Sequence, residues 1–236
     1  MELERILHRH GFGSRKACRA LIRAGRVAVN GQACDHPFAE IETEELVFSV
    51  DGEDWPYRAE ATLVLNKPAG YECSRRPIHH PSIYSLLPVP LLERGVQTVG
   101  RLDEDTTGLL LFTDDGQLNH LLTSPKRKVP KTYRVTLKHA GDAALVAALL
   151  EGVLLHDEPE PICAAACELL AERQLRLVVT EGKYHQVKRM VAAAGNRVEA
   201  LHREAVGNYR LPDGLTAGAW VWLSPAELAA VRGENR

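Results

Sequence analysis

Residues 100–116 read GRLDEDTTGLLLFTDDG. A Gly-Arg turn precedes three consecutive acids, Asp103, Glu104 and Asp105, and a Thr-Thr-Gly segment then leads into the apolar segment 108–113. A short apolar run bounded by turn residues is typical of a buried β-strand. Carboxylates beside a buried strand are costly unless water or cations satisfy their charge. This stretch therefore predicts a core strand with a candidate functional site just before it.

The acidic turn is compatible with several kinds of chemistry. Asp103 and Asp105 alternate around Glu104, as oxygen ligands of a hard cation would. One carboxylate beside Arg101 can instead serve as a nucleophile, and an exposed turn without a role is a third interpretation. Asp103 and Asp105 also suit the carboxyl pair of a glycoside hydrolase, about 5 Å apart in retaining enzymes and roughly 6.5–9.5 Å apart in inverting ones.

Strand-like and helical segments alternate on both sides of this turn. The strand candidates are 62–66, 108–113, 132–137, 168–170, 175–179, 197–201 and 220–223. The helix candidates are 143–150 and 184–194, and Ser224 is the expected N-cap of a final short helix. Many strands with interspersed helices favour an α+β domain, in which helices flank a mixed, largely antiparallel sheet.

The N-terminal residues follow a different pattern. The apolar positions of a first helix are Leu3, Ile6, Leu7 and His10. Ser14 is a good N-cap for a second helix, and the alternating segment 26–29 predicts a strand followed by an Asn-Gly hairpin turn. Residues 51–60 are polar, contain Gly and Pro, and are interpreted as a linker. We therefore expect a small domain at 1–60, linker included, and a larger domain at 61–236.

The formal net charge of −2 conceals strongly segregated charge. Residues 1–30 carry seven Lys or Arg against two acids, and residues 121–140 carry six bases and no acid. Residues 31–60 carry nine acids against one base. Basic patches bind polyanions because each neutralised phosphate releases counterions. Charge alone is therefore compatible with nucleic-acid binding and equally with solvated basic faces.

Composition excludes several classes of protein. Apolar residues make up 45% and charged residues 25%, as in an ordinary globular protein. No run approaches the ~20 apolar residues of a membrane span, and the first residues lack the pattern of a signal peptide. The five cysteines are scattered, and Cys163 and Cys167 have no second ligand pair nearby for zinc. We expect a cytoplasmic protein with no membrane partner, no disulfide framework and no metal site.

Residues 11–31, GFGSRKACRALIRAGRVAVNG, resemble the S4 RNA-binding domain. The basic helix, the Gly stop and the Val-Ala-Val-Asn-Gly turn occur in the order typical of that family. In the S4 family a helix-turn-helix pair presents basic residues to structured RNA. The resemblance implies that Arg15, Lys16, Arg19 and Arg23 contact RNA, and an amphipathic helix with a solvated basic face is the alternative.

Four segments in series resemble the pseudouridine synthases of the RsuA/RluA-like superfamily. The stretch 100–116 resembles their signature motif. The other three segments are NKPAG at 66–70, KTYRV at 131–135 and EGKYHQVKRM at 181–190. The similarity covers nearly the whole chain. It implies an α+β protein in which a small, αL-like S4 domain precedes a pseudouridine-synthase domain.

The resemblance assigns roles to individual residues. Asp103 matches the catalytic aspartate of a reaction that cleaves the N1–C1′ bond of a uridine, turns the base and rejoins it through C5. Tyr133 matches a tyrosine that packs against the target base, Lys188 a basic residue paired with the aspartate, and Arg101 an arginine that helps to hold the RNA open. Because the reaction is an isomerisation, no cofactor is implied. A carboxylate suits attack on C1′ and attack on the base ring alike.

The resemblance also implies RNA contacts around the catalytic cleft. An exposed basic loop and the helix of the last motif supply them: Lys126, Arg127, Lys128, Lys131, Gln186 and Arg189. Reaching C1′ and C5 in folded RNA requires flipping the nucleotide out, at a cost of roughly a few kcal/mol. From residue pattern alone, the alternating strand favours a core position for Tyr133. The basic helix is compatible with an ordinary solvated face.

Within the superfamily, the chain most resembles the RsuA type, which acts on the small ribosomal subunit. The features are its compact length, KPAGYECS, the Asp-x-Asp-Thr-Thr-Gly-Leu form of the signature, PKTY and EGKYHQVKRM. Large-subunit relatives more often show an Arg-Asn-Arg form of the last motif. We expect a monomer whose partner is small-subunit (16S) rRNA, free or in an assembly intermediate with ribosomal proteins. The alternatives are a large-subunit (23S) synthase and a non-catalytic S4-type RNA-binding protein.

Overall fold

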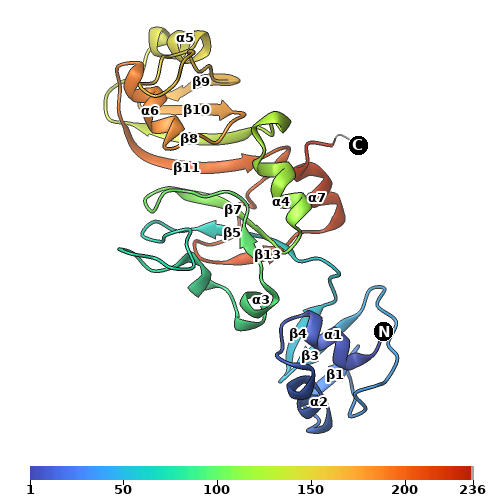
Figure 1. The fold of residues 1–236 in the computed structure, drawn as a ribbon. Coiled ribbons are helices and arrows are strands. Elements are labelled where there is room, and N and C mark those ends of the chain that lie inside the picture. The colour runs from blue at the N-terminus through green and yellow to red at the C-terminus, as the bar shows by residue number, and fades with distance from the viewer. Residues whose placement is uncertain (235–236) are drawn as a thin grey trace. The chain divides into compact units, whose positions relative to one another are not determined.

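The computed structural model describes residues 1–234, and the chain forms two compact units (Figure 1). One unit combines Met1–Ala61 with Leu87–Gln97, and the other combines Thr62–Leu86 with the chain from Thr98 onward. Residues 87–97 thus belong to the first unit, although the sequence pattern placed them in the domain 61–236. The reason is a long-range contact, because Arg94 in α3 (Val89–Arg94) donates hydrogen bonds to backbone carbonyls near residue 59.

The first unit carries α1 (Leu3–Arg9), α2 (Arg15–Arg23) and an antiparallel sheet of order β2-β1-β3-β4. The strands are β1 (Val27–Val29), β2 (Gln32–Ala33), β3 (Val47–Val50) and β4 (Glu53–Pro56). Ser14 caps α2 as predicted, accepting a hydrogen bond from the backbone N–H of Ala17 at 3.3 Å. Asn30 and Gly31 have φ values of 47° and 80°, which a tight two-residue hairpin requires.

The expected linker at 51–60 is wrong in its first half, where β4 pairs with β3. Asp51 and Gly52 have φ values of 56° and 83° and form the turn between these strands. Trp55 is 3% exposed, and its ring lies edge-on to Phe12 with centroids 5.3 Å apart. The polar composition of the segment concealed this one buried aromatic side chain, which ties the strand to the core of the unit.

The second unit is built on one mixed sheet of order β13-β5-β7-β11-β8-β10-β9, with β12 beside β11 and β6 beside β7. The strands are β5 (Thr62–Lys67), β6 (Gln97–Thr98), β7 (Thr107–Thr113), β8 (Lys131–Leu137), β9 (Ala166–Ala171), β10 (Gln174–Val179), β11 (Val198–Val206), β12 (Tyr209–Arg210) and β13 (Trp220–Trp222). Along the path β13 to β9, only β7 and β11 pair in parallel. The predicted α+β fold with a largely antiparallel sheet is confirmed.

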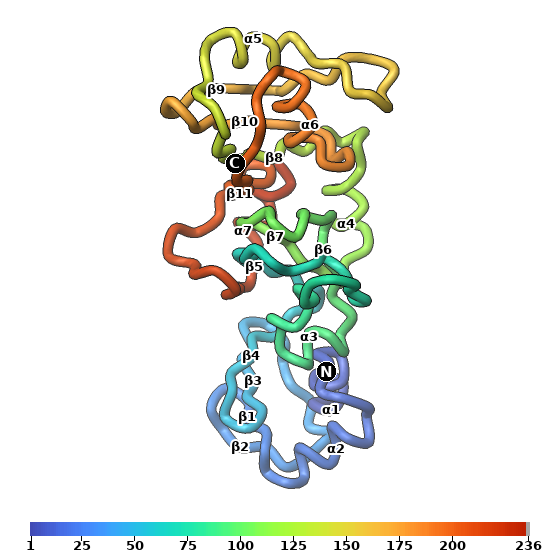
Figure 2. Tube along the Cα trace, turned by 90° about the vertical axis from the view of Figure 1, so that its left-hand side faces the viewer, coloured from blue at the N-terminus to red at the C-terminus, as the bar shows by residue number. Residues whose placement is uncertain are grey.

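Two helix pairs cover different parts of this sheet (Figures 1 and 2). The helices α5 (Ala143–Glu151) and α6 (Gln186–Ala193) share an apolar core with β8 and β10. The helices α4 (Gly116–Thr123) and α7 (Pro225–Val231) share a second core with β5 and β7. Within residues 1–234, no helix combines the length and apolar character that crossing a membrane requires.

The two halves of the sheet meet where β7 runs beside β11. This parallel pairing is short, with Thr107 opposite His202 and Gly108 opposite Arg203. Gly108 has a φ of 100°, and a Cβ atom there would lie 2.4 Å from the carbonyl oxygen of Arg203. A residue without a side chain is therefore required at this position, and it brings the acidic turn before β7 close to β11.

Candidate active site

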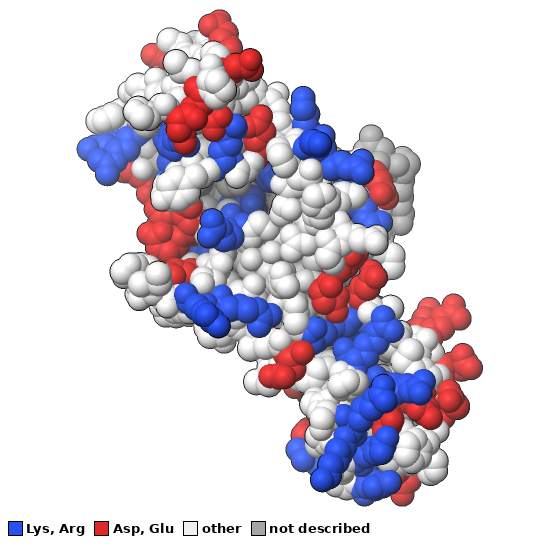
Figure 3. Space-filling view, viewed as in Figure 1, with Lys and Arg blue, Asp and Glu red and all other residues white. Residues whose placement is uncertain are grey.

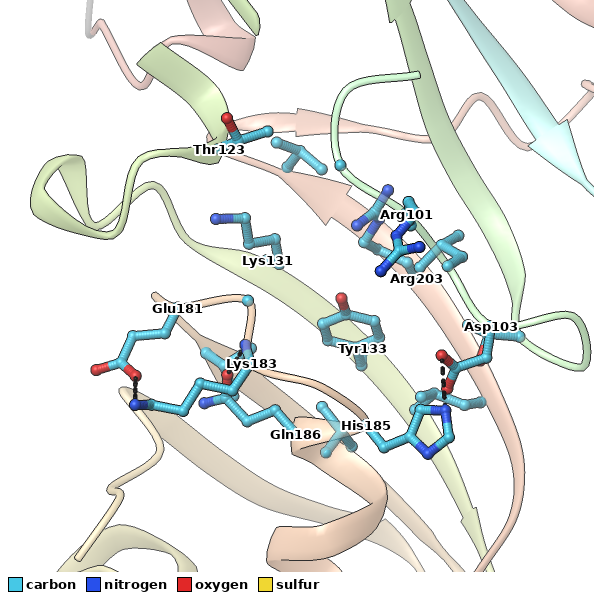
Figure 4. A pocket seen from close by; sticks show the side chains of 18 of the residues that line it. Arg101, Asp103, Thr123, Lys131, Tyr133, Glu181, Lys183, His185, Gln186 and Arg203 are labelled. Carbon is cyan, nitrogen blue, oxygen red and sulfur yellow. Dashed lines mark hydrogen bonds and ion pairs between the residues drawn. The ribbon is translucent and has the colours of Figure 1, made fainter. Parts of the chain in front are cut away.

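A hollow of about 170 Å³ lies in the second unit, where the acidic turn, β8, β11 and the start of α6 meet (Figures 3 and 4). This volume is well above the roughly 10–15 Å³ that a cavity needs to hold one water molecule. Four residues predicted as catalytic line the hollow: Arg101, Asp103, Tyr133 and Lys188. Residues from three distant parts of the sequence thus converge on one space.

Asp103 is the carboxylate at the centre of this group, and its side chain is 25% exposed. Its Oδ2 atom lies 3.1 Å from Nζ of Lys188. Its Oδ1 atom lies 3.3 Å from Nε2 of His185, a pair drawn as a dashed line in Figure 4. The structure therefore brings Lys188 to Asp103, as the family resemblance implies, and adds a histidine that the predicted site did not include.

Lys188 also binds Asp105, which the sequence analysis left without an assigned partner. Its Nζ atom donates to both carboxylate oxygens of Asp105, at 2.6 and 2.9 Å. Burial disfavours the charge of Lys188, but hydrogen bonds to Asp105 and Asp103 outweigh it and hold the pKa of Lys188 above its usual value. Burial likewise opposes ionisation of Asp105, yet Lys188 keeps the pKa of Asp105 below its usual value. One ammonium group thus serves two carboxylates.

The loop before α6 explains how His185 reaches Asp103. The sequence pattern predicts a helix from 184, whereas α6 begins at Gln186 because His185 adopts a left-handed φ of 48°. Gln186 is 6% exposed, and its Oε1 atom accepts a hydrogen bond from the backbone N–H of Lys183 at 3.0 Å. Gln186 therefore orders this loop from within, and the positions of His185 and Lys188 depend on it.

An aromatic ring and three cations form another side of the hollow. Tyr133 on β8 lies opposite Arg203 on β11 and points into the space (Figure 4). Lys131 and Arg101 line the same side. Within residues 1–234, none of these three cations has a carboxylate partner, and Arg203 donates instead to the carbonyl of Leu109 at 2.8 Å. Burial, followed by the nearby Arg203, lowers the pKa of Lys131 to about 8.

The buried side chain of Lys67 stabilises the backbone of the acidic turn through hydrogen bonds. This side chain is fully buried, and its ammonium donates to the carbonyls of Pro68, Glu104 and Thr106, each at 3.0 Å. Burial lowers the pKa of Lys67, while three carbonyl acceptors match the three N–H groups of the charged form. Lys67 therefore fixes the backbone of the turn on both sides of Asp105, directly after Asp103.

The remaining predicted RNA contacts fall into two groups. Lys126, Arg127 and Lys128 are exposed on a loop before β8. Arg189 pairs with Asp157 and donates to the carbonyl of Tyr184 at 3.1 Å, so its charge is already matched. No group of three His, Cys, Asp or Glu side chains within residues 1–234 is arranged to hold a metal ion.

The basic helix of the first unit is divided in the same way. Lys and Arg side chains gather over this unit in Figure 3. Arg15, Lys16 and Arg23 on α2 are exposed. Arg19 is 39% exposed, but it pairs with Glu4, whose side chain is 3% exposed, and it lies over the ring of Phe38. The charge of Arg19 is therefore already matched, which leaves Arg15, Lys16 and Arg23 as the exposed cations of this helix.

Several lining residues were missed by the sequence analysis, and some of them had a signal. His185 and Lys188 are three residues apart, and that spacing places them on one side of a helix turn. Arg203 lies within a largely buried strand, where an arginine is rare unless its charge has a partner or a function. Asp105 shares Lys188 only because the turn folds back, which no local pattern predicts.

In the second unit, cations without a carboxylate partner among the described residues surround a hollow that also holds a carboxylate and an aromatic ring, and the first unit carries a basic helix. Such a combination suits an enzyme that acts on RNA. Residues 61–193 match the family described as RNA pseudouridylate synthase, and residues 1–45 match the S4 domain. The chain therefore belongs to the RNA pseudouridylate synthase family.

Its relatives are similar over nearly their full lengths. The chain is 39% identical to "Ribosomal small subunit pseudouridine synthase A" of Vibrio parahaemolyticus, over 98% of this chain and 99% of the relative. It is 38% identical to the protein of the same name from Escherichia coli K12, over 98% and 100%. A crystal structure described as a pseudouridylate synthase superposes with a TM-score of 0.70 at 36% identity, covering 98% of this chain and 99% of that one.

Proposed function

We propose that this enzyme converts one uridine of small-subunit (16S) ribosomal RNA to pseudouridine, with Asp103 as the catalytic carboxylate. The observation that carries the proposal is the position of Asp103, which faces a hollow while its two oxygens lie 3.1 Å from Lys188 and 3.3 Å from His185. The near full-length similarity to small-subunit synthases supports the choice of RNA.

Each neighbour of Asp103 has a proposed task in the isomerisation. Asp103 forms a transient bond to C1′ or to the base ring, the N1–C1′ bond breaks, and C1′ is rejoined to C5. The bond to Asp103 is broken again, C5 loses its proton and N1 takes up a proton, so the product is an isomer of the substrate. The Tyr133 ring supports the flipped base by stacking. Lys188 provides the counter-charge of Asp103. Arg101 fills the position vacated by the flipped nucleotide, and the balance of atoms and electrons needs no cofactor.

The proposal also covers how the RNA is held. The first unit docks structured RNA through Arg15, Lys16 and Arg23, and the loop with Lys126, Arg127 and Lys128 contacts phosphates beside the hollow. The proposed catalytic residues all line one hollow of this chain, and we propose that the enzyme acts as a monomer. We further propose that the enzyme works in the cytoplasm on rRNA that is free or in an assembling ribosomal particle.

The test is pseudouridine mapping by carbodiimide labelling and primer extension on unmodified small- and large-subunit rRNA. The wild type should produce one new stop in small-subunit rRNA. Asp103→Asn should abolish it, with a loss of at least ~1000-fold in rate, because the group that forms the transient bond is removed. Glu104→Gln changes the adjacent exposed carboxylate and should stay within a few-fold of the wild type.

Other outcomes contradict separate parts of the proposal. A stop in large-subunit rRNA alone would keep the reaction and overturn the choice of subunit. Full turnover by Asp103→Asn would overturn the assignment of the carboxylate. A stop that forms only when assembling particles replace free rRNA would identify the particle as the substrate.

A further inference from the structure

Tyr184 is an exposed aromatic ring next to His185, a residue that lines the hollow, and none of the roles proposed above uses it. Among the Phe, Tyr and Trp side chains of residues 1–234, only Phe38 and Tyr184 are exposed, at 44% and 72%. Phe38 lies under the guanidinium group of Arg19 in the first unit. Tyr184 keeps most of its surface in water, so its ring is available to a ligand.

The Tyr184 ring is held in one place. It stacks on the ring of His185, with centroids 3.8 Å apart and planes inclined by 20°. Its backbone carbonyl accepts a hydrogen bond from Arg189, which is itself paired with Asp157. A surface that is ordered before binding loses little conformational entropy when a ligand arrives. Tyr184 and His185 thus form a prepared two-ring stack rather than a mobile side chain.

This two-ring stack ends at the catalytic carboxylate. The His185 ring touches Tyr184 on one side, and its Nε2 atom lies 3.3 Å from Asp103 on another. A nucleotide whose C1′ approaches Asp103 is therefore separated from Tyr184 by the His185 ring, and its neighbour in the RNA chain can reach the exposed ring of Tyr184. Because the target uridine has left the helical stack, that neighbour has lost a stacking partner on one face.

Charges around the stack favour a base over a phosphate. Lys183 is paired with Glu158 at 2.7 Å and with Glu181 at 3.5 Å, the second pair being visible in Figure 4. Arg189 is paired as well, so the cations beside Tyr184 are already matched by carboxylates. The cations of the hollow that lack a carboxylate partner within residues 1–234 include Arg101 and Lys131. Phosphates of a bound strand are therefore expected at these residues, which leaves Tyr184 to contact a base.

We propose that Tyr184, backed by His185, is the stacking platform for the base of a nucleotide adjacent to the target uridine. This role rests on the proposed function, since it requires a nucleotide bound at Asp103. Stacking on an aromatic side chain tolerates any base, so the platform adds binding energy next to the reacting nucleotide without reading its sequence.

The first test measures kcat/KM on a small-subunit rRNA fragment that contains the mapped uridine. Tyr184→Ala should lower kcat/KM by roughly 5- to 100-fold, the range for loss of one base–aromatic stack. Tyr184→Phe should restore most of this loss because the ring is kept, whereas Tyr184→Leu should not. Ile78→Ala, a change at an 82% exposed side chain of the same unit, is the control and should match the wild type. Thermal melting should show all four variants to be folded.

The second test removes the partner base. An abasic site on one side of the target uridine should slow the wild type by the same factor as Tyr184→Ala, and it should slow Tyr184→Ala no further. The platform would be overturned if Tyr184→Ala were as active as the wild type. It would also be overturned if an abasic site, on either side of the target uridine, reduced the activity of Tyr184→Ala by the same factor as that of the wild type. Absence of pseudouridine formation by the wild type itself would instead overturn the proposed function, and the platform with it.

Discussion

On β8 and β11, adjacent residues point to opposite sides of one sheet, and their charges have different partners. Tyr133 and Arg203 line the hollow, whereas Arg134 and Glu204 line a second, polar depression. There the carboxylate of Glu204, a residue that is 5% exposed, is surrounded by arginines. The three that pair with it are Arg134 at 2.5 Å, Arg176 at 3.3 Å and Arg210 at 3.7 Å.

The side that lines the hollow shows the opposite arrangement. Arg101, Lys131 and Arg203 have no carboxylate partner within residues 1–234. An unpaired cation in a half-buried position keeps its capacity to bind an anion, at a cost in desolvation. The comparison indicates that strand alternation on β8 and β11 separates the residues of the Glu204 cluster from Lys131 and Arg203, which face the hollow, while Arg101 reaches the hollow from the turn before β7.

The largest effect that tests this separation is expected on the Glu204 side. Glu204→Ala should lower the free energy of unfolding by about 3 kcal/mol, near the low end for a broken buried ion pair, because the arginines are partly hydrated. Arg210→Ala removes the most exposed partner, 63% exposed, and should cost less than about 1 kcal/mol. Urea unfolding measures both. A normal unfolding midpoint for Glu204→Ala would contradict a stabilising role for this side.

The matching change on the hollow side is Arg101→Ala. Here kcat/KM should fall by about 10- to 100-fold, the worth of one hydrogen bond to a charged group. The urea midpoint should not change, since this exposed side chain has no carboxylate partner in the folded protein. Single-turnover assays beside urea titrations separate the two effects. Reduced stability with unchanged turnover would reverse the comparison.

A pH titration tests Lys131 on the hollow side, with two opposite trends. Because the folded pKa of about 8 lies below the usual 10.5, the unfolded chain binds more protons between these values, so stability of the free protein should rise with pH there. RNA affinity should fall over the same range, by at most about tenfold per pH unit, since phosphate binding needs the charged amine. Lys131→Arg should remove both trends, and an unchanged affinity profile would contradict the contact.

The smallest effect concerns α2 of the first unit, which carries both kinds of cation: Arg19 is paired with a carboxylate, whereas Arg15 and Arg23 are exposed. Changing Arg15 and Arg23 to Gln should lower the slope of log affinity against log salt by about 0.7–0.9 for each phosphate that is no longer neutralised. Arg19→Gln should leave the slope unchanged and destabilise the unit, because Glu4 would remain buried without its partner. A change of slope in Arg19→Gln alone would show that the RNA is bound by Arg19 and not by its exposed neighbours.

Local sequence patterns were sufficient for much of the fold. Strong periodicity and good capping residues predicted the core strand of the signature motif, the α5 segment and the Ser224 cap, whose capping box with Glu227 is present. The predicted boundaries of elements were wrong where a single residue had a stronger effect than the average composition of its neighbours. Trp55 turned half of a polar linker into a strand, and the left-handed His185 delayed the start of α6.

The candidate site was less predictable than the fold, for a physical reason. Motif resemblance supplied Asp103 and Lys188, and the structure places them together. The arginines on Glu204 were not predictable, because cross-strand pairs depend on a register set by the whole sheet. Arg19 likewise shared a basic face with its neighbours in the sequence, and only the packing of α1 against α2 shows that it is paired with Glu4.

Lys67 has a consequence for how the enzyme responds to its medium. Three carbonyl oxygens around one buried positive centre are what a loop offers to a small inorganic ion, and here the centre belongs to the chain itself. Such a tethered ion cannot be removed by a chelator, exchanged for another species or diluted away. The shape of the acidic turn is therefore insensitive to the ionic composition of the surroundings, even though RNA docking through exposed cations is strongly sensitive to it.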